Sequence, residues 1–312
     1  MDENNSFFNN NQKNIYNKNK KPKKEDKCKT ILFLSLILLI FFELFIILKQ
    51  NLSFNDKIQK EKDDKYRKII NYIKNENHEN HTDLSKFISY SQYLEDIVLF
   101  LFLYDIKIGF YIDVGANDPI KDSVTNFFYL RGWNGINIEP MDDKYLLLKN
   151  NRARDINLNI AAGKEKGNTT LYIYKGLTTI MKNFSIPGMA KKIVKVETMT
   201  DICKKYVPPG TIIEFCKIDV EGAERNVLLG YDFINYRPKI FCIEATLPLS
   251  MTPSYQLFED ILIKNNYSFI YQYNVNRFYV DNKSKFLNAL KQRVILIDLF
   301  IAKYNEKKNI QK

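Results

Sequence analysis

The stretch FYIDVGANDP, residues 110–119, decides the fold of this 312-residue chain. It begins with a run of strand length that is apolar except for Asp113, which is typical of a strand buried on both faces of a parallel sheet. Gly115, Asn117 and Asp118 follow at once, so the strand ends in a polar turn. We therefore expect a buried strand whose carboxyl end contributes to a ligand site.

Outward from this stretch, apolar runs of strand length alternate with helical patterns. The expected strands are 110–116, 135–140, 156–162, 213–222 and 239–245, with added strands at 170–174 and 192–198. The expected helices are 120–131, 141–150, 200–206, 223–233 and 254–266, and a closing hairpin joins 269–273 to 277–281. Strands that alternate with helices pair in parallel. We predict an α/β fold with a Rossmann-like, doubly wound, mostly parallel sheet and an antiparallel terminal hairpin.

The composition divides the chain into five segments. An Asn/Lys-rich tail at 1–30 holds too few large apolar residues to fold, and we expect it to be disordered. The remaining segments are an apolar run at 31–48, a charged stem at 49–85, the folded domain at 86–285 and a basic tail at 286–312. The apolar stretch Val294–Ala302 predicts an amphipathic helix that lies either on a membrane or on the domain.

The run Ile31–Leu48 predicts a transmembrane signal anchor. Its eighteen residues would span roughly 27 Å as a helix, which is enough to cross a bilayer core. A cleavable signal peptide usually has a shorter apolar region, of ~7–15 residues, followed by a small-residue cleavage site. More lysines precede the run than follow it, which favours a cytoplasmic N-terminus. We expect a single-pass type II membrane protein with a lumenal or extracytoplasmic domain.

Several classes of function are excluded by what the central block lacks. The net charge of +11 arises mainly from the two flanks, whereas residues 91–280 are almost neutral, so a nucleic-acid partner is not expected. The two histidines, His78 and His81, lie outside this block, which excludes a Ser-His-Asp triad or a HExxH zinc site there. The four cysteines form no CxxC pair. Catalysis must therefore use carboxylates, lysine, tyrosine, a lone cysteine or a cofactor.

Acidic residues end four of the expected strands, at Asp113, Glu139, Asp219 with Glu221, and Glu244. A dinucleotide site needs G-x-G-x-x-G, but here only Gly115 is present and Asp118 would repel a phosphate. Glu139 follows Gly115 by 24 residues, where an acid can bind both ribose hydroxyls. S-adenosylmethionine is a cationic nucleoside without phosphates and fits this pattern. The alternative is structural: Asp113 caps a helix and Glu139 is a turn residue.

Six stretches in order resemble the FkbM-type methyltransferases. They are Ser91-Gln92-x-x-Glu95-Asp96, YIDVGANDP (111–119), FFYLRGWNGINIEP (127–140), RDINLNIA (154–161), KIDVEGAERNVLLG (217–230) and NRFYV (276–280). The resemblance covers about residues 88–282 and implies a class I fold with S-adenosylmethionine-dependent methyl transfer, often to a hydroxyl of a sugar or similar metabolite. Leu94 departs from the pattern, because glycine is common at that position in the family.

The resemblance also implies roles for individual residues. The methionine part of the cofactor would be lined by Asp113, Gly115, Ala116 and Asn117, and the ribose would be held by Glu139. The adenine would lie near Asn159, Ile160 and Ala161. The transferred methyl would face Asp219 and Glu221. Without histidine, a carboxylate or Lys217 must accept the proton, and we favour Asp219 or Glu221. The alternative role of Glu221 is to stabilise a helix N-terminus, and Glu224 is expected at the surface or in a first helical turn. Asp219 with Glu221 could also hold Mg²⁺, which the sequence leaves unsupported.

Three hypotheses follow. The first is a membrane-anchored O-methyltransferase that acts on a glycan or on a lipid-linked sugar. The second is a catalytically inactive binding or trafficking protein with the same fold. The third, an NAD-linked oxidoreductase, is disfavoured by the missing glycines. Trp133 is expected in the core, and Cys203, Cys216 and Cys242 are expected to be buried thiols.

Overall fold

The computed structural model describes residues 88–174, 177–184, 187–283 and 287–310, together with isolated helical positions between 43 and 67. The expected tail at 1–30 lies outside the described residues, as does the expected membrane span at 31–48 except for Glu43 and Ile46. Within the described part of the chain, no helix combines the length and the apolar character needed to cross a bilayer. The chain divides after Asp64 into two units, and all elements named below belong to the second unit.

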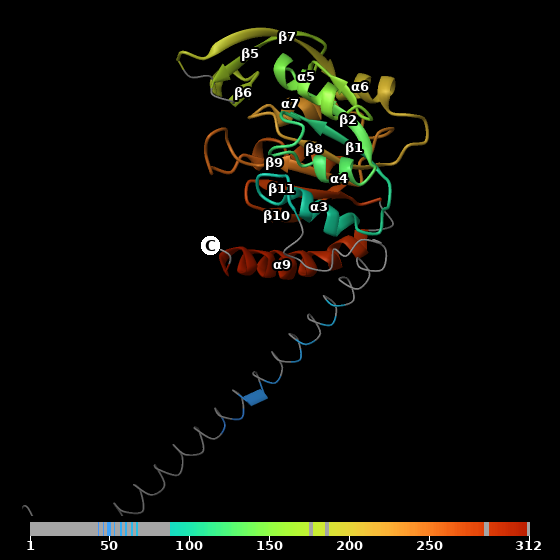
Figure 1. Ribbon diagram of the computed structural model, residues 1–312, viewed down its shortest axis with the longest axis vertical. Coiled ribbons are helices and arrows are strands. Elements are labelled where there is room, and N and C mark those ends of the chain that lie inside the picture. Colours follow the sequence, from blue (N-terminus) through green and yellow to red (C-terminus); the bar gives the residue numbers. More distant parts are fainter. Residues whose placement is uncertain are drawn as a thin grey trace, which may run out of the picture. The chain divides into compact units, whose positions relative to one another are not determined.

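A seven-stranded sheet forms the centre of this unit (Figure 1). Its strand order is β10 (Tyr267–Tyr273), β11 (Asn276–Asp281), β9 (Ile240–Glu244), β8 (Ile213–Ile218), β1 (Phe110–Val114), β2 (Asn134–Ile138) and β3 (Ile156–Leu158). From β9 to β3 all neighbours pair in parallel, whereas β11 runs antiparallel to both β9 and β10. This mixed α/β sheet fits a Rossmann-like fold, and the terminal hairpin is antiparallel as predicted.

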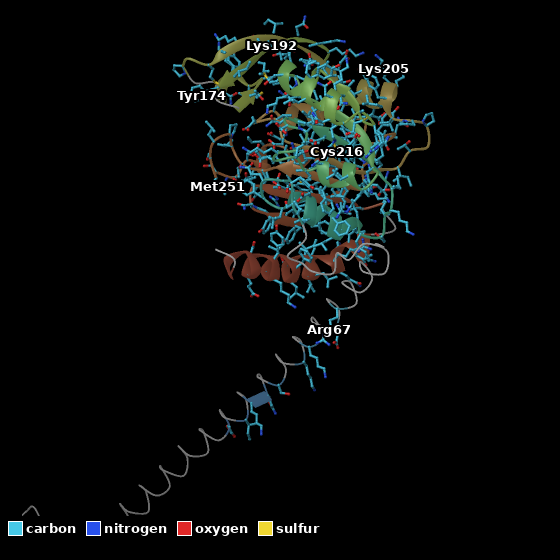
Figure 2. All side chains as sticks on the ribbon, in the orientation of Figure 1. Arg67, Tyr174, Lys192, Lys205, Cys216 and Met251 are labelled. Carbon is cyan, nitrogen blue, oxygen red and sulfur yellow. The ribbon has the colours of Figure 1, made fainter. Side chains whose placement is uncertain are left out.

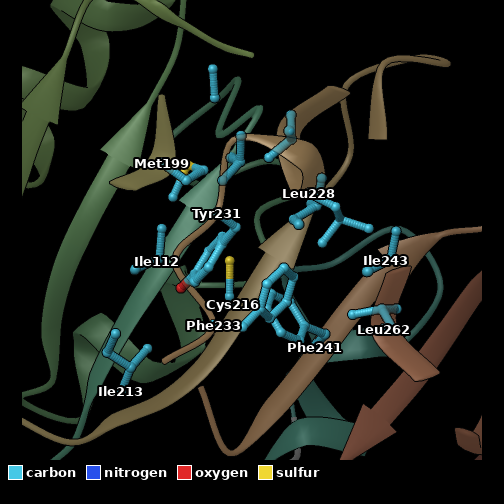
Figure 3. Packing of buried hydrophobic residues seen from close by; sticks show 14 of the residues in the cluster. Ile112, Met199, Ile213, Cys216, Leu228, Tyr231, Phe233, Phe241, Ile243 and Leu262 are labelled. Carbon is cyan, nitrogen blue, oxygen red and sulfur yellow. The ribbon is translucent and has the colours of Figure 1, made fainter. Parts of the chain in front are cut away.

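Both faces of the sheet are buried because its strands alternate their apolar side chains between two cores. On β9, Cys242 faces one core and Phe241 the other. The second core, shown in Figure 3, packs the sheet against α6 (Met199–Tyr206), α7 (Glu224–Leu229) and α8 (Glu259–Lys264). Trp133 is buried in the first core, and the three described cysteines are buried free thiols, as the sequence predicted.

The helix α3 (Glu95–Leu103), to which the sequence pattern assigned no element, covers the first core. All its residues are buried, and a helix that is apolar all round needs a partner on each side. The sheet supplies one side, and the long C-terminal helix α9 (Leu287–Ile310) supplies the other through Leu290, Ile297 and Phe300 (Figure 1). Of the two placements expected for the C-terminal helix, the structure therefore shows the one on the domain.

A second, four-stranded sheet is inserted between β3 and α6. Its order is β4 (Ala161–Gly163), β7 (Ala190–Thr198), β5 (Gly167–Tyr174) and β6 (Leu177–Thr179). The prediction of one strand over 156–162 is wrong, because the chain changes sheet within it. The Asn159 side chain donates to the Glu139 carbonyl at 3.2 Å, and Ala161 then pairs with Val196 of β7.

Four other predicted boundaries are wrong, because side chains or turns delay, shorten or divide the element. The helix expected from 120 begins only at Asn126, as α4 (Asn126–Leu130), because the Asp118 side chain accepts the N–H groups of residues 120 and 121 in a turn. The strand expected to 222 ends at Ile218, and the helix expected to 233 ends at Leu229, before Gly230. The helix expected over 254–266 is divided into a 3-10 turn at Tyr255–Leu257 and α8.

Candidate functional site

A narrow cleft opens at the carboxyl ends of the central strands. It encloses a volume of only about 40 Å³ and is bounded by the ends of β1, β2 and β8 and by the inserted sheet. Its lining residues are Val114, Gly115, Ile138, Glu139, Pro140, Ala161, Ala162, Leu171, Thr178, Ile180, Asp219, Val220 and Ala223. Ligands of open α/β sheets bind in this place, so we take the cleft as the candidate site.

Gly115 allows the ends of β1 and β8 to approach each other closely. It has a φ of +78°, and a Cβ placed on it would lie 1.9 Å from the Asp219 carbonyl oxygen. Only glycine therefore fits there, for reasons of both conformation and space. The N–H groups of Gly115 and Ala116 donate to the Ile138 carbonyl at 3.0 and 3.2 Å, which fixes the turn against β2.

Glu139 lies at the end of β2, and each oxygen of its carboxylate accepts one backbone N–H. It is 4% exposed, and its two carboxylate oxygens accept the N–H groups of Asn117 and Met141, each at 2.8 Å. Burial raises the pKa of Glu139, and the two backbone N–H groups partly oppose that rise. Glu139 is therefore a turn residue, as the structural alternative expected. The same contacts hold its carboxylate in the wall of the cleft.

Lys217 is a fixed cation at the centre of the site. Its ammonium donates to the Gly115 carbonyl at 2.8 Å and lies 3.4 Å from Asp113 Oδ1 and 3.5 Å from Asp219 Oδ2. Burial opposes its charging, but the carboxylates of Asp113 and Asp219 outweigh that effect and raise the pKa of Lys217. The sequence left Lys217 as an alternative proton acceptor. The structure contradicts that role, because an ammonium with a raised pKa stays protonated at neutral pH.

Asp113 is buried in β1 and does not cap a helix, contrary to the structural alternative. Its Oδ2 atom accepts the Thr125 hydroxyl at 2.8 Å, and its Oδ1 atom faces Lys217. Asp113 therefore holds the lysine from beneath the cleft and does not itself line the opening.

Three carboxylates gather at the other end of the cleft. Single oxygen atoms of Asp219, Glu221 and Glu244 all lie within 4.8 Å of one another. Burial and the charge of Asp219 raise the pKa of Glu221 to about 8, and the same two causes raise the pKa of Glu244 further above its usual range. Both effects favour the protonated forms of Glu221 and Glu244. Its three oxygens also suit a divalent cation such as Mg²⁺.

The loop that carries Glu221 is held from two sides. Glu221 has a φ of +53°, and its carbonyl accepts the Thr179 hydroxyl of β6 at 2.7 Å. Glu224 is 3% exposed and accepts the N–H groups of Val220 and Gly222, each at 3.1 Å. The expectation of a surface position for Glu224 is wrong, and its first-turn position is right. Since α7 begins only at Glu224, Glu221 lies outside the helix and does not stabilise its first turn.

The structure separates the residues expected around an adenine. Ala161 lines the cleft, whereas Asn159 and Ile160 line a different, open hollow beside the edge strand β3, bordered by Tyr145 and Tyr206. Ala116 is buried behind the Gly115 turn, and Asn117 contributes its backbone N–H to Glu139. Figure 2 shows Lys205, another residue of the hollow, at the surface of the domain.

Two groups of site residues were given no role from the sequence. Glu244 ends the apolar strand β9 and was counted among the acidic strand ends, but no function was assigned to it. The inserted sheet contributes Leu171, Thr178 and Ile180, and no pattern in the sequence marks their approach to the cleft.

Comparison with known proteins adds the family. A model of the methyltransferase FkbM domain matches residues 113–271, about half of the chain. The match begins at the buried aspartate of β1 and includes Glu139, Lys217 and the carboxylate cluster. Searches of curated proteins and of solved structures found no match. The family match and the geometry of the cleft together show that this chain belongs to the FkbM methyltransferase family.

Proposed function

We propose that the protein transfers a methyl group from S-adenosylmethionine to a hydroxyl of a sugar or glycan-like acceptor. The observation that carries this proposal is the arrangement of Gly115, Glu139 and Asp219 around one cleft, with Lys217 fixed behind it. Methyltransferases normally use this cofactor, and the family assignment therefore points to it.

The residues present fit S-adenosylmethionine in charge and in the groups that they offer. The glycine turn brings backbone close to the opening, and the acidic groups there suit a cation without phosphates. Glu139 would hold the ribose, because each of its oxygens keeps an acceptor position beyond the backbone N–H that it already binds. The Gly115 turn would border the methionine part, and Ala161 and Val220 would border the base.

When bound, S-adenosylmethionine supplies an electrophilic methyl whose carbon–sulfur bond breaks as the bond to the acceptor oxygen forms. The acceptor hydroxyl then has one proton to lose, and a carboxylate of the Asp219–Glu221–Glu244 cluster accepts it. Lys217 stays protonated and holds Asp219 in place. Since the pKa of Glu221 is about 8, the capacity of the cluster to accept a proton increases from neutral to slightly alkaline pH.

We also propose that the apolar run 31–48 anchors the protein in a membrane as a type II protein, with the domain on the lumenal or extracytoplasmic side. The support is the length of the run and the excess of lysines before it. The acceptor would then be a glycan or a lipid-linked sugar available at that membrane. Protease protection of a C-terminal tag tests the orientation.

The second candidate function is a catalytically inactive binding or trafficking protein. The narrowness of the cleft favours it, because Leu171, Thr178 and Ile180 of the inserted sheet approach the strand ends closely. Against it, Asp113, Glu139 and Asp219 are all in place around an intact glycine turn.

Calorimetric titration of S-adenosylmethionine into the full-length protein in detergent separates the two. We expect binding in about the micromolar range that is lost in Glu139→Ala. The wild-type protein should turn over an acceptor. The Asp219→Asn variant should lose this turnover. A folded protein that does not bind the cofactor would favour the binding or trafficking function.

A further inference from the structure

Arg152 is the most completely buried basic residue among the described residues and lies beneath the cleft. It follows α5 (Asp142–Asn151) and is 1% exposed. All five of its N–H groups donate hydrogen bonds. Nε donates to Asp155 at 3.0 Å, and Nη1 donates to the Pro119 carbonyl and to Asn126 Oδ1 at 3.0 Å each. Nη2 donates to the hydroxyls of Tyr111 at 3.0 Å and Thr125 at 2.8 Å. An arginine with five fixed acceptors has a single orientation, so it can determine the positions of its partners.

Thr125 connects this arginine to the site. A hydroxyl has one proton, and the Thr125 hydroxyl donates it to Asp113 Oδ2 at 2.8 Å. It must therefore accept the N–H of Arg152 Nη2 through its lone pair. The direction of both hydrogen bonds is thus fixed by the chemistry of the groups, and the positive charge of Arg152 strengthens the bond from Thr125 to Asp113.

The connection continues from Asp113 to the opening of the cleft. Its other oxygen, Oδ1, pairs with Lys217, whose ammonium in turn binds the Gly115 carbonyl and faces Asp219. Two buried ion pairs, Arg152–Asp155 and Lys217–Asp113, are therefore joined through one hydroxyl.

We propose that Arg152 and Thr125 are positioning residues of the methyl-transfer site. Thr125 holds Asp113 in the orientation that keeps the Lys217 ammonium between the Gly115 turn and Asp219. The role of the two residues in cofactor binding rests on the proposed function, whereas their effect on the order of the cleft does not.

A purely structural role for the network can be separated from this one, because the network has branches. The Tyr111 hydroxyl accepts from the same nitrogen of Arg152 and donates to Asp155 at 2.7 Å, but it makes no contact with Asp113. Removal of either hydroxyl leaves one N–H of Arg152 without its acceptor. Only the removal of the Thr125 hydroxyl also takes a donor from Asp113.

The experiment compares three variants of the full-length protein in detergent. Thr125→Val removes the hydroxyl at nearly constant volume, Thr125→Ser retains it, and Tyr111→Phe cuts the branch that does not lead to the cleft. Two properties are measured at a temperature at which all three are folded. They are the dissociation constant of S-adenosylmethionine by calorimetry, and hydrogen–deuterium exchange of peptides that cover residues 113–119 and 217–222 without ligand.

We expect Thr125→Val to weaken cofactor binding by about tenfold or more and to accelerate exchange in both peptides. Thr125→Ser should stay within about threefold of the wild type. Tyr111→Phe should lower the melting temperature by an amount similar to Thr125→Val, yet leave the dissociation constant and the exchange of 217–222 unchanged.

Equal loss of affinity and equal acceleration of exchange in Thr125→Val and Tyr111→Phe would overturn the proposal, because the network would then act through stability alone. Unchanged affinity and exchange in Thr125→Val would also overturn it. If Thr125→Val does not fold, Thr125→Cys takes its place under the same criteria, since a thiol is a weak donor. If the wild type does not bind the cofactor, the proposed function fails, and the exchange measurement alone decides this inference.

Discussion

The two ends of the cleft use carboxylates in opposite ways. At the β2 end, Glu139 accepts two backbone N–H groups and is almost completely buried. At the β8 and β9 ends, Asp219, Glu221 and Glu244 face one another, and one Glu244 oxygen is buried without a hydrogen-bond donor among the described residues. The first arrangement fixes a charge in place, and the second leaves acidic groups that compete for protons. A site that must hold a cofactor rigidly and exchange a proton with an acceptor needs both.

The comparison also explains why Lys217 lies between the two ends. It binds the Gly115 carbonyl at the end of β1 and faces Asp219 beside the carboxylate cluster. One protonated amine therefore lies between the Gly115 turn and the carboxylate cluster. Four predictions, from the largest expected effect to the smallest, test this division.

Gly115→Ala should disrupt the cofactor end most strongly. The new Cβ would overlap the Asp219 carbonyl, so the β1 and β8 ends must separate, and we expect a loss of several kcal/mol of unfolding free energy together with all cofactor binding. Gly210→Ala is the matched control, because Gly210 has a similar φ of +77° and no atom lies within 4 Å of its would-be Cβ. The control should cost only about 1–2 kcal/mol. Thermal melts and calorimetry measure both, and equal losses would contradict the role of the close approach.

Glu139→Gln should weaken the same end by a smaller amount. An amide turns one acceptor into a donor and sets it against a backbone N–H of Asn117 or Met141. We expect a cost of about 1–3 kcal/mol in unfolding free energy and at least about tenfold weaker cofactor binding. Glu165→Gln is the control, because Glu165 is exposed and should change stability by less than about 0.5 kcal/mol. A Glu139→Gln protein as stable as this control would show that the two backbone bonds contribute little.

Glu221→Gln should leave stability unchanged or raise it, in contrast to Glu139→Gln. The pKa of Glu221 is about 8 in the folded protein, above its usual value of 4.5, so the folded state binds the extra proton. Wild-type stability should therefore fall as pH rises from about 5 to about 8, by up to a few kcal/mol, and the glutamine variant should lose this slope. Melting temperatures across this pH range measure the effect. Parallel curves for the two proteins would show that Glu221 titrates normally.

Removal of divalent cations should have the smallest effect. Protons on Glu221 or Glu244 and the ammonium of Lys217 already compensate the negative charge of the cluster. We expect a chelator to change the initial rate of methyl transfer by less than about twofold. A larger loss that Mg²⁺ restores would instead assign the three carboxylates to a metal.

Leu94 shows how much of the site region could be predicted from sequence. Glycine is common there in the family, and the structure gives Leu94 a φ of +65°, the left-handed conformation that glycine adopts without strain. Leu94 therefore has the backbone conformation that a glycine at this position would favour. A Cβ in this conformation costs roughly 1–2 kcal/mol, which the partial burial of the leucine side chain against the first core can offset.

The strand ends were predictable because buried parallel strands read as apolar runs, and the polar residue after each run marks the functional edge. Asp113, Glu139 and Asp219 were identified in this way. The division of 156–162 between two sheets was not predictable, because both halves have strand character and only the pairing of Ala161 with β7 separates them. Asn159 and Ile160 line a different opening from Ala161 for the same reason.

The sequence by itself determined the class of the fold, the glycine turn and the acidic strand ends, because these depend on local periodicity and on residue types that tolerate few conformations. Only the tertiary structure decided which charges are neutralised. Lys217 and Asp113 each precede the last residue of their strand by one position, yet their roles depend on partners more than 100 residues away, such as the Gly115 carbonyl for Lys217. The pKa of a buried group depends on its desolvation and on its neighbours in space, and the local sequence determines neither of them.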